Sequence, residues 1–210
     1  MNMPTSDHAN FWNTRYADAG EDYLFGIAPA KFIAAHAGSF ATGSTALSVA
    51  DGEGRNSVWL AQQGLRVTAL EVSAVALRKA RQLARVSRVA VEFIEADALI
   101  FDWPQAAYDH VVGVFIQFAT AAERDRLFNG MKQAVKPGGL LLLHGYTPRQ
   151  LEYRTGGPSA VENLYTAEML RAAFADFEIL ELREYEDELA EGAAHRGRSA
   201  LIDLVARRSH

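Results

Sequence analysis

Apolar runs alternate with amphipathic stretches along the first two thirds of the chain. The apolar runs are short, and several are rich in β-branched residues, which is typical of strands. They cover residues 45–50, 65–71, 89–95, 109–118 and 140–146. Because helical patterns separate them, we expect right-handed βαβ units in a doubly wound, mostly parallel, Rossmann-like α/β sheet with helices on both faces.

Local signals predict where the helices begin and end. Apolar side chains of residues 74–87 fall on one face, and Ser73 precedes them as a candidate N-cap. Gly64 is a candidate C-cap for the helix that follows the first strand. Thr120 and Glu123 have capping-box spacing for a helix that ends near Val135, where "KPGG" breaks the pattern before the fifth strand.

The alternation of apolar runs and helical patterns ends after residue 146. A Pro/Gly-bearing segment, "TPRQLEYRTGGPS", leads to a helical pattern over residues 167–175. Residues 177–185 and 199–207 have strand patterns joined by a glycine-containing turn, which predicts a C-terminal antiparallel hairpin and seven strands in all. The stretch "EYEDELAEG", residues 184–192, is also compatible with a helix, and both alternatives stay open.

Composition and charge narrow the classes of protein and partner. The 210 residues are 49% hydrophobic, which fits one globular domain, and the net charge of -5 does not favour nucleic acid or anionic membrane. The absence of cysteine excludes disulfides, thiolate nucleophiles and cysteine-ligated metals. The polar stretch 1–13 lacks the regions of a secretion signal, and no apolar run could span a bilayer. We therefore expect a cytoplasmic protein.

A loop of small residues follows the first strand, within "ALSVADGEGRNSVWLAQQG". Ala50, Gly52 and Gly54 alternate there, just before a helical pattern. Such a loop presents backbone N–H groups and a helix N-terminus to a polar ligand. Glu71 ends the second strand about 20 residues further on, where a carboxylate can accept both hydroxyl protons of a ribose. Together they predict a site for an adenosine-type ligand.

The loop departs from a dinucleotide fingerprint. Ser57 stands where the third glycine is required, and Asp51 and Glu53 add carboxylates that would repel a pyrophosphate. A sulfonium with an amino-acid tail would meet no such repulsion. A tight structural turn without a ligand is the open alternative.

Several longer segments resemble one enzyme family. "VADGEGRNSVWLAQQGLRVTALEVS", "EADALIFDWPQAAYDHVVGVFIQF" and "VKPGGLLLLHGYTP" resemble the motifs of class I S-adenosylmethionine-dependent methyltransferases. Within that class the chain most resembles small tellurite-resistance and thiopurine methyltransferases, whose N-terminal segment is similar to "FWNTRYADAGEDYLFGIAPAKFI". The resemblance covers most of residues 11–148. It implies methyl transfer from S-adenosylmethionine, with S-adenosylhomocysteine as product, to a small-molecule or inorganic acceptor such as a thiol or an oxyanion.

The resemblance also implies a division of the chain and a set of cofactor contacts. It implies a single domain over residues 1–210, with an N-terminal flap (1–35), a cofactor-binding half (36–146) and a substrate-side half (147–210). Glu71 would bind the ribose, Asp97 the adenine amine, and Phe115 would border the transferred methyl. The whole expected cofactor set is Trp12, Tyr16, Phe25, Gly26, Ala50, Asp51, Gly52, Gly54, Asn56, Glu71, Val72, Asp97, Ala98, Val114 and Phe115. Ser48 and Ala50 depart from the family, which usually has an acid and a glycine there; we expect binding to persist.

Acceptor contacts are expected from the variable segments at the same sheet edge. The candidates are His144, Tyr146, Arg149, Tyr153, Arg154, His195, Arg196 and Arg198. The arginines could hold an anionic acceptor, although a solvated loop charge is the alternative for each of them. The sulfonium supplies the electrophile, so no catalytic residue or metal ligand is assigned, and a general base is needed only where the acceptor loses a proton.

Two other functions stay open. One is a nicotinamide-dependent oxidoreductase, and the other is a non-catalytic protein that binds S-adenosylmethionine or another nucleoside. Arg78, Arg81, Arg85 and Arg88 form a basic stripe on one helix, which we interpret as its solvated face rather than as a nucleic-acid site. We expect a small-molecule partner and neither nucleic acid nor membrane.

Overall fold

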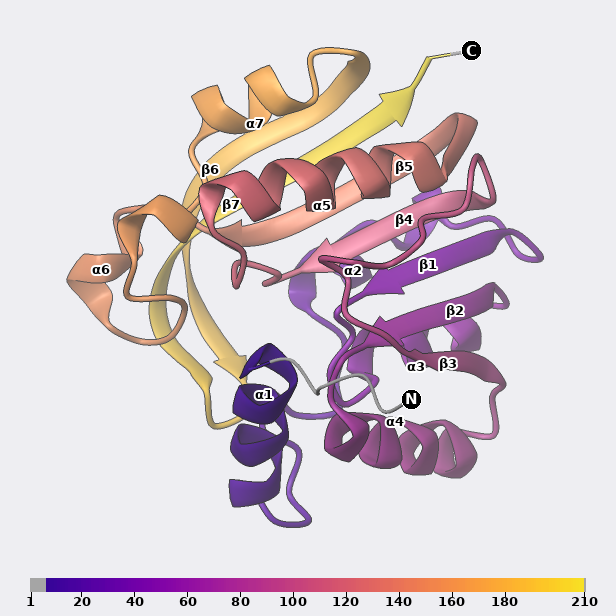
Figure 1. Ribbon diagram of the computed structural model, residues 1–210, viewed down its shortest axis with the longest axis vertical. Coiled ribbons are helices and arrows are strands. Elements are labelled where there is room, and N and C mark those ends of the chain that lie inside the picture. The colour runs from indigo at the N-terminus through magenta and orange to yellow at the C-terminus, as the bar shows by residue number, and fades with distance from the viewer. Residues whose placement is uncertain (1–6, 210) are drawn as a thin grey trace.

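A seven-stranded sheet forms the centre of the computed structural model, which describes residues 7–209 (Figure 1). The polar stretch 1–13 therefore lies partly outside the described residues. The strand order is β3-β2-β1-β4-β5-β7-β6. The strands are β1 (Thr45–Val49), β2 (Arg66–Glu71), β3 (Val91–Glu95), β4 (Tyr108–Val114), β5 (Val135–Tyr146), β6 (Phe177–Glu191) and β7 (His195–Arg208).

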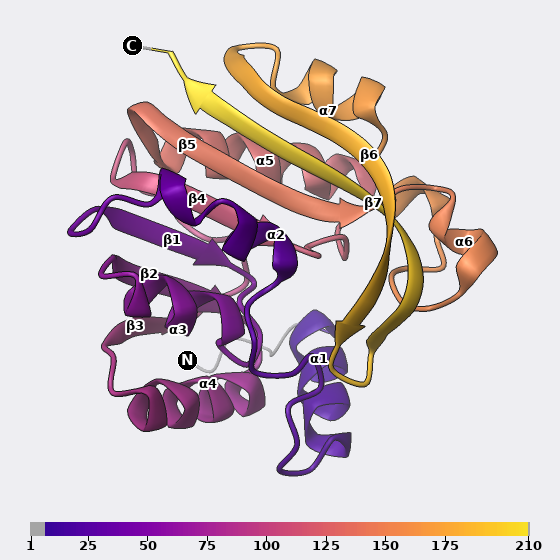
Figure 2. The ribbon, with the colours of Figure 1, turned by 180° about the vertical axis from the view of Figure 1, so that it is seen from behind.

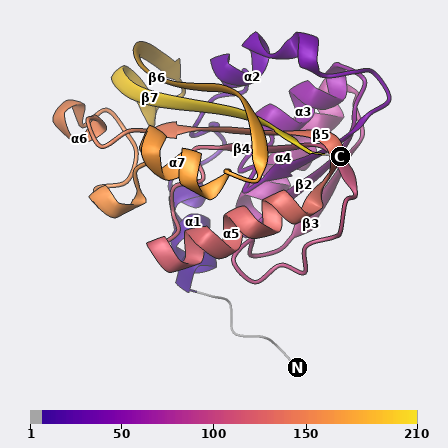
Figure 3. The same ribbon diagram turned by 90° about the horizontal axis from the view of Figure 1, so that it is seen from above.

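Helices cover both faces of the sheet, as the sequence predicts. The α-helices are α1 (Asp7–Asp18), α2 (Lys31–Ala35), α3 (Arg55–Gln62), α4 (Ala74–Ser87), α5 (Ala121–Ala134), α6 (Gln150–Tyr153) and α7 (Ala167–Ala173). Short 3-10 turns, η1 (Ala37–Ser39) and η2 (Val161–Asn163), accompany them. Seen from above, α2 and α3 lie on one face and α5 and α7 on the other (Figure 3). Within residues 7–209, none of the helices has the length and apolar composition that a membrane span requires.

The strand order reverses at β1. This strand pairs in parallel with β2 on one side and with β4 on the other, while the chain reaches β4 only after β2 and β3. The connections therefore leave β1 and β4 in opposite directions, which opens a crevice at the carboxyl ends of the strands. The glycine loop and the end of β2 both lie at that edge.

The C-terminal hairpin confirms the predicted antiparallel pair and excludes the helical alternative for residues 184–192. Strand β7 runs antiparallel to both β5 and β6. The pairing continues from Phe177↔Arg208 to Glu191↔His195, so β6 is far longer than residues 177–185. Helix-forming Glu, Leu and Ala residues are held in a strand because β7 offers hydrogen-bond partners along the whole stretch.

Two predicted boundaries move for a structural reason. Strand β5 already begins at Val135, whose partner is Tyr108, so "KPGG" lies within the strand, beside a register shift in β4. Strand β4 ends at Val114, because Phe115 turns the backbone with φ +57°. The predicted caps are confirmed: Ser73 accepts the Ala76 amide at 3.1 Å, and Gly64, with φ +87°, follows α3.

The tip of the β6–β7 hairpin reaches beyond the sheet and approaches α1 (Figures 1 and 2). There the Ala193 amide donates to the Leu24 carbonyl at 3.0 Å. Gly192 lies so close to this segment that a Cβ atom would stand 2.5 Å from the Gly26 nitrogen. The hairpin tip and the N-terminal segment therefore meet above the edge of the sheet where the strands end.

Candidate active site

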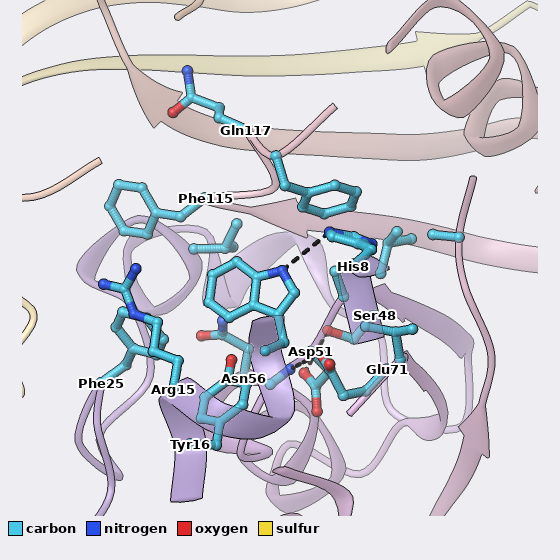
Figure 4. Close-up of a pocket in the computed structure, with 18 of the residues that line it drawn as sticks. His8, Arg15, Tyr16, Phe25, Ser48, Asp51, Asn56, Glu71, Phe115 and Gln117 are labelled. Carbon is cyan, nitrogen blue, oxygen red and sulfur yellow. Dashed lines mark hydrogen bonds between the residues drawn. The ribbon is translucent and has the colours of Figure 1, made fainter. Parts of the chain in front are cut away.

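A cavity of about 300 Å³ lies at the carboxyl ends of β1, β2 and β4, between α1 and the β6–β7 hairpin (Figure 4). Much of the set expected from the sequence lines it. These residues are Trp12, Tyr16, Phe25, Ala50, Asp51, Gly52, Asn56, Glu71, Val72, Ala98, Val114 and Phe115, with Tyr146 and His195 from the acceptor candidates. Phe25 and Phe115 lie on one side of the cavity, and Ser48, Asp51 and Glu71 on the other (Figure 4).

The small residues of the loop are explained by backbone conformation and by packing. Ala50, Gly52 and Gly54 all have left-handed backbones, with φ of 48°, 63° and 91°. A Cβ atom on Gly52 would stand 2.7 Å from the Tyr16 hydroxyl, and one on Gly54 would stand 2.9 Å from the Ala80 Cβ. Glycine therefore lets α1 and α4 approach the loop closely. Ala50 adopts the same conformation against its preference.

The departure at Ser48 is compensated within the loop. Its hydroxyl donates to Asp51 Oδ1 at 2.7 Å, and the Ser57 amide donates to the same oxygen at 3.2 Å. The Ser57 hydroxyl donates to the other oxygen. Burial raises the pKa of Asp51, and these hydrogen bonds oppose that shift. Asp51 thus organises the loop with a serine in place of the usual acid.

Glu71 is the central carboxylate of the cavity and is only 4% exposed. Its Oε2 accepts the Gly52 amide at 2.8 Å, and its Oε1 accepts the Ser73 amide at 2.8 Å. Burial raises the pKa of Glu71 to about 7, against the effect of these two hydrogen bonds. Each oxygen keeps acceptor capacity for a ligand, because a carboxylate oxygen has two lone pairs.

Glu53 does not line the cavity, so the expectation that its carboxylate faces a ligand is wrong. It is buried and forms an ion pair with Lys79 of α4, with Nζ 2.9 Å from Oε1. Lys79 also donates to the carbonyls of Tyr16 and Asp22. A buried carboxylate needs a counter-ion, and α4 supplies one behind the loop. Glu53 therefore joins the loop, α4 and the N-terminal segment.

Helix α1 forms one wall of the cavity and contributes residues that the sequence reasoning missed. His8, Phe11 and Arg15 line the cavity with Trp12 and Tyr16. Trp12 donates its ring N–H to His8 Nε2 at 3.0 Å and stacks on Tyr16 with ring centroids 5.7 Å apart. The spacing 8, 11, 12 and 15 is that of one helix face, and this was the signal that could have found them.

Other lining residues were not among those expected to contact a ligand. They are Ser48, Val49, Arg55, Ala96, Gln117, Phe118, Gly157, Pro158 and Asn163. Most stand on loops or at element ends that the topology brings to the same edge of the sheet. Their position depends on tertiary packing, and no local motif encodes it.

Gly26, Gly54 and Asp97 lie beside the cavity rather than in its wall. Gly26 backs the hairpin tip, and Gly54 packs on α4. Asp97 accepts the Leu99 amide at 2.9 Å and stands 3.8 Å from His8 Nδ1. Their roles in cofactor binding stay predictions.

The remaining acceptor candidates lie elsewhere. His144 is buried in the core, where its Nδ1 is 2.6 Å from Asp203 Oδ1 and its ring stacks on Phe32. Arg149 and Arg198 are exposed and form ion pairs with Glu186 instead of facing the cavity. Tyr153, Arg154 and Arg196 are also outside the cavity wall. His195 and Arg196 diverge because neighbouring side chains on a strand point to opposite faces.

Comparison with known proteins finds a family match in the central part of the chain. Residues 46–139 match a family model described as a methyltransferase domain. No curated protein matches the chain significantly. Among solved structures, the chain is similar to the protein in a structure on the conversion of a disulfide bond into a thioacetal group during echinomycin biosynthesis. That match has a TM-score of 0.79 and 18% identity over 96% of this chain and 92% of the other.

Two further structures share the fold at low sequence identity. Magnesium protoporphyrin IX methyltransferase (ChlM) from Synechocystis PCC 6803, a structure with bound SAH, matches with a TM-score of 0.72 and 15% identity over 98% of this chain and 99% of the other. TehB from Haemophilus influenzae matches with a TM-score of 0.71 and 16% identity over 94% of this chain and 67% of the other. The predicted fold is confirmed, and the domain match supports the expected methyltransferase family.

Proposed function

Since residues 46–139 match a methyltransferase domain, we propose that this protein transfers a methyl group from S-adenosylmethionine to a small-molecule acceptor. One observation carries the proposal. The buried Glu71 carboxylate lies in the cavity at the end of β2, held by the amides of Gly52 and Ser73. That is the place and the chemistry for the two hydroxyls of a ribose.

The other residues of the cavity fit the rest of this ligand. Arg15 lines the cavity beside Trp12, with its guanidinium carbon 5.5 Å from the ring, and offers a cation to an amino-acid carboxylate. Val72 and Ala98 give apolar surface near Glu71 for a purine. Asp51 and Glu71 make this end of the cavity acidic, which suits a cation better than a pyrophosphate.

Bound S-adenosylmethionine supplies an activated methyl group, so the protein has to position the acceptor and exclude water. Orientation of this kind can account for roughly 7–11 kcal/mol of a barrier. Phe115 and Val114 line the cavity at the end of β4 and would face the reacting end of the ligand. The contact between the hairpin tip and residues 24–26 would close the cavity during the reaction.

We also propose that the protein belongs to the small tellurite-resistance and thiopurine methyltransferase type. The aromatic wall that α1 builds over the cavity supports this subgroup, because the N-terminal segment carries that resemblance. The shared fold with TehB is consistent with it. The subgroup would suggest an inorganic oxyanion or a thiol as acceptor, and the panel of acceptors below compares these compounds with hydroxyarenes.

Calorimetry tests the proposed ligand. We expect S-adenosylmethionine and S-adenosylhomocysteine to bind and NAD not to bind. Binding of NAD alone would support the nicotinamide-dependent oxidoreductase and contradict our proposal. Because Glu53 does not line the cavity, Asp51 is the loop carboxylate that would repel the pyrophosphate of NAD. Comparing the affinities for S-adenosylmethionine and NAD therefore tests the proposed ligand directly.

Transfer of a labelled methyl group separates an enzyme from a non-catalytic binding protein. The purified protein is incubated with S-adenosylmethionine labelled in the methyl group and with a panel of thiols, tellurium and selenium oxyanions, amines and hydroxyarenes. We expect label in at least one acceptor. Tight binding of S-adenosylhomocysteine without transfer to any acceptor would favour the non-catalytic protein.

A further inference from the structure

One end of the cavity is distinct from the end that holds Glu71. Beyond Phe115 its wall consists of Tyr146 at the end of β5, His195 at the start of β7, and residues between α6 and α7 that include Pro158 and Asn163. In the proposed function Phe115 borders the transferred methyl, so the surface beyond it faces the acceptor. The inference below rests on that function and names the acceptor class.

Aromatic rings dominate this end. The His195 ring contacts Phe115 and Phe25, with centroid distances of 4.3 Å and 4.5 Å. The rings of Phe115 and Tyr146 are 4.6 Å apart. Flat apolar side chains on several sides favour a planar ring in the ligand, which can stack on one ring and meet the edge of another.

Polar atoms without partners stand among these rings. Within residues 7–209 the Tyr146 hydroxyl and His195 Nδ1 are buried and make no hydrogen bond. Their side chains belong to residues that are 1% and 7% exposed. A buried polar group without a partner is unfavourable, so a ligand that supplies the missing partner binds more tightly. A hydroxyl group can both donate and accept a hydrogen bond, so one such group on a ligand can serve a donor and an acceptor.

The charges at this end cancel. Arg55 lines the cavity, and its guanidinium forms a buried ion pair with Glu191, NH1 to Oε2, at 2.8 Å. Burial and the positive charges of Arg55, His144 and Arg15 lower the pKa of His195 to about 3, so the imidazole is neutral at neutral pH. The other arginine that acts on His195 is Arg15, which the proposed function assigns to the amino-acid carboxylate of the cofactor. Within residues 7–209 no unassigned arginine or lysine therefore lines the cavity to hold an anionic acceptor.

The two polar rings are fixed in place. Gln117 accepts the Tyr146 amide at 2.6 Å and donates to the Tyr146 carbonyl at 2.8 Å. A Cβ atom on Gly156 would stand 3.0 Å from the Tyr146 hydroxyl and 3.3 Å from His195 Cδ2, and one on Gly157 would stand 2.7 Å from Tyr146 Cδ2. This glycine pair lets the loop lie directly on both rings.

We propose that Tyr146 and His195 form the acceptor subsite and that the acceptor is an uncharged hydroxyarene, a phenol-type or heteroaromatic hydroxyl compound. Its ring lies among Phe25, Phe115 and Tyr146, and its hydroxyl bridges the Tyr146 hydroxyl and His195 Nδ1. The hydroxyl oxygen forms the new bond to the methyl carbon, while the electron pair of the broken carbon–sulfur bond stays on sulfur. The hydroxyl proton passes to His195 and then to solvent.

A weak base suffices for that proton. The acceptor oxygen becomes strongly acidic as it gains the methyl group, so a neutral imidazole can take the proton even though its pKa is low. The titratable and charged groups near His195 are Arg55 with Glu191, His144, Arg15 and Tyr146. Because the imidazole stays neutral from pH 5 to pH 8, its contribution as a base to the methyl-transfer rate is constant over that range.

The experiment uses 2-naphthol as the probe, with S-adenosylhomocysteine for binding and S-adenosylmethionine for transfer. We expect saturable binding of 2-naphthol to the protein loaded with S-adenosylhomocysteine, and methyl transfer to its oxygen. His195→Asn should lower the transfer rate about 100-fold, and Tyr146→Phe should weaken 2-naphthol binding about tenfold. Both variants should bind S-adenosylhomocysteine within twofold of the wild type.

Matched controls remove an equivalent group outside the cavity. His110→Asn changes another buried histidine whose Nδ1 has no partner within residues 7–209, and Tyr165→Phe changes another buried tyrosine. Both should leave 2-naphthol binding and transfer unchanged. The inference is overturned if 2-naphthol does not bind, if the subsite variants behave like the controls, or if 2-mercaptoethanol or tellurite is methylated faster than 2-naphthol. Failure of S-adenosylhomocysteine to bind the wild type would instead reject the proposed function.

Discussion

The backbone amide of Gly52 donates to the carboxylate of Glu71 at 2.8 Å, and this bond joins the loop after β1 to the end of β2. Gly52 can aim its N–H in this direction because its φ is 63°, in the left-handed region. The second carboxylate oxygen is held by the Ser73 amide. The carboxylate that we propose as the acceptor for a ribose is thus oriented by the protein's own backbone.

Glu71→Ala should weaken binding of S-adenosylhomocysteine by about 10- to 100-fold. The change removes the hydroxyl acceptors and also leaves the Gly52 amide without its partner, at about 1–3 kcal/mol. Isothermal titration calorimetry measures the effect. Glu95→Ala is the matched control, because Glu95 is the register partner of Glu71 on β3 but is exposed and outside the cavity. Equal affinities for the two variants would show that the ligand site is elsewhere.

Ligand affinity should fall as the solution becomes more acidic. The pKa of Glu71 is raised to about 7, so its ionised fraction drops about tenfold between pH 8 and pH 6. Ribose hydroxyls donate to the ionised form, and the affinity should drop by up to about the same factor. The contribution of this group to stability runs the other way: it is present below its ordinary pKa and is lost as pH rises through 7.

Glu71→Gln separates this titration from others in the cavity. The amide cannot ionise, so the variant should bind S-adenosylhomocysteine more weakly at pH 8 and lose less affinity on acidification. Calorimetry at several pH values measures both profiles. A wild-type affinity that is constant from pH 8 to pH 6 would contradict the assignment of the ribose site to Glu71.

Ala50→Gly should stabilise the protein. Ala50 has φ 48°, a conformation that costs a non-glycine residue about 1–2 kcal/mol. Glycine avoids this cost, but its greater conformational freedom in the unfolded chain offsets part of the gain. We expect a net gain of about 0.5–1 kcal/mol in the free energy of unfolding, measured by denaturant titration. Ala106→Gly, at φ 49° outside the cavity, should give a similar gain. A loss of stability in Ala50→Gly alone would mean that the methyl group packs favourably.

Gly192→Ala should open the closed edge of the cavity. Its Cβ would stand 2.5 Å from backbone atoms of Leu24, Phe25 and Gly26, which cannot move aside as a side chain can. We expect a loss of about 2–4 kcal/mol in unfolding free energy and faster release of S-adenosylhomocysteine, measured by stopped flow. Gly20→Ala is the control. Gly20 also has a left-handed backbone, but a Cβ atom there would meet open space, so only the conformational cost applies. Equal release rates in both variants would show that the hairpin tip does not close the cavity.

Much of the architecture could be predicted because its signals are local. The strand runs and the caps at Ser73 and Thr120 depend on residues a few positions apart, and they hold in the structure. Glu53 could not be placed in the same way. Its direction is set by Lys79, which another helix brings into contact. The length of β6 could not be predicted from the sequence either, since its outer half is a strand only because β7 pairs with it.

The sequence alone determined the order of strands and helices along the chain, the loop of small residues and the carboxylate at the end of β2. These depend on periodicity, on glycine's backbone freedom and on the fixed position of strand ends in a parallel sheet. Only the tertiary structure decided that His195 faces the cavity while His144 lies in the core with Asp203. Burial and pairing are set by the packing of distant segments, and the chemistry of the proposed acceptor end follows from that packing.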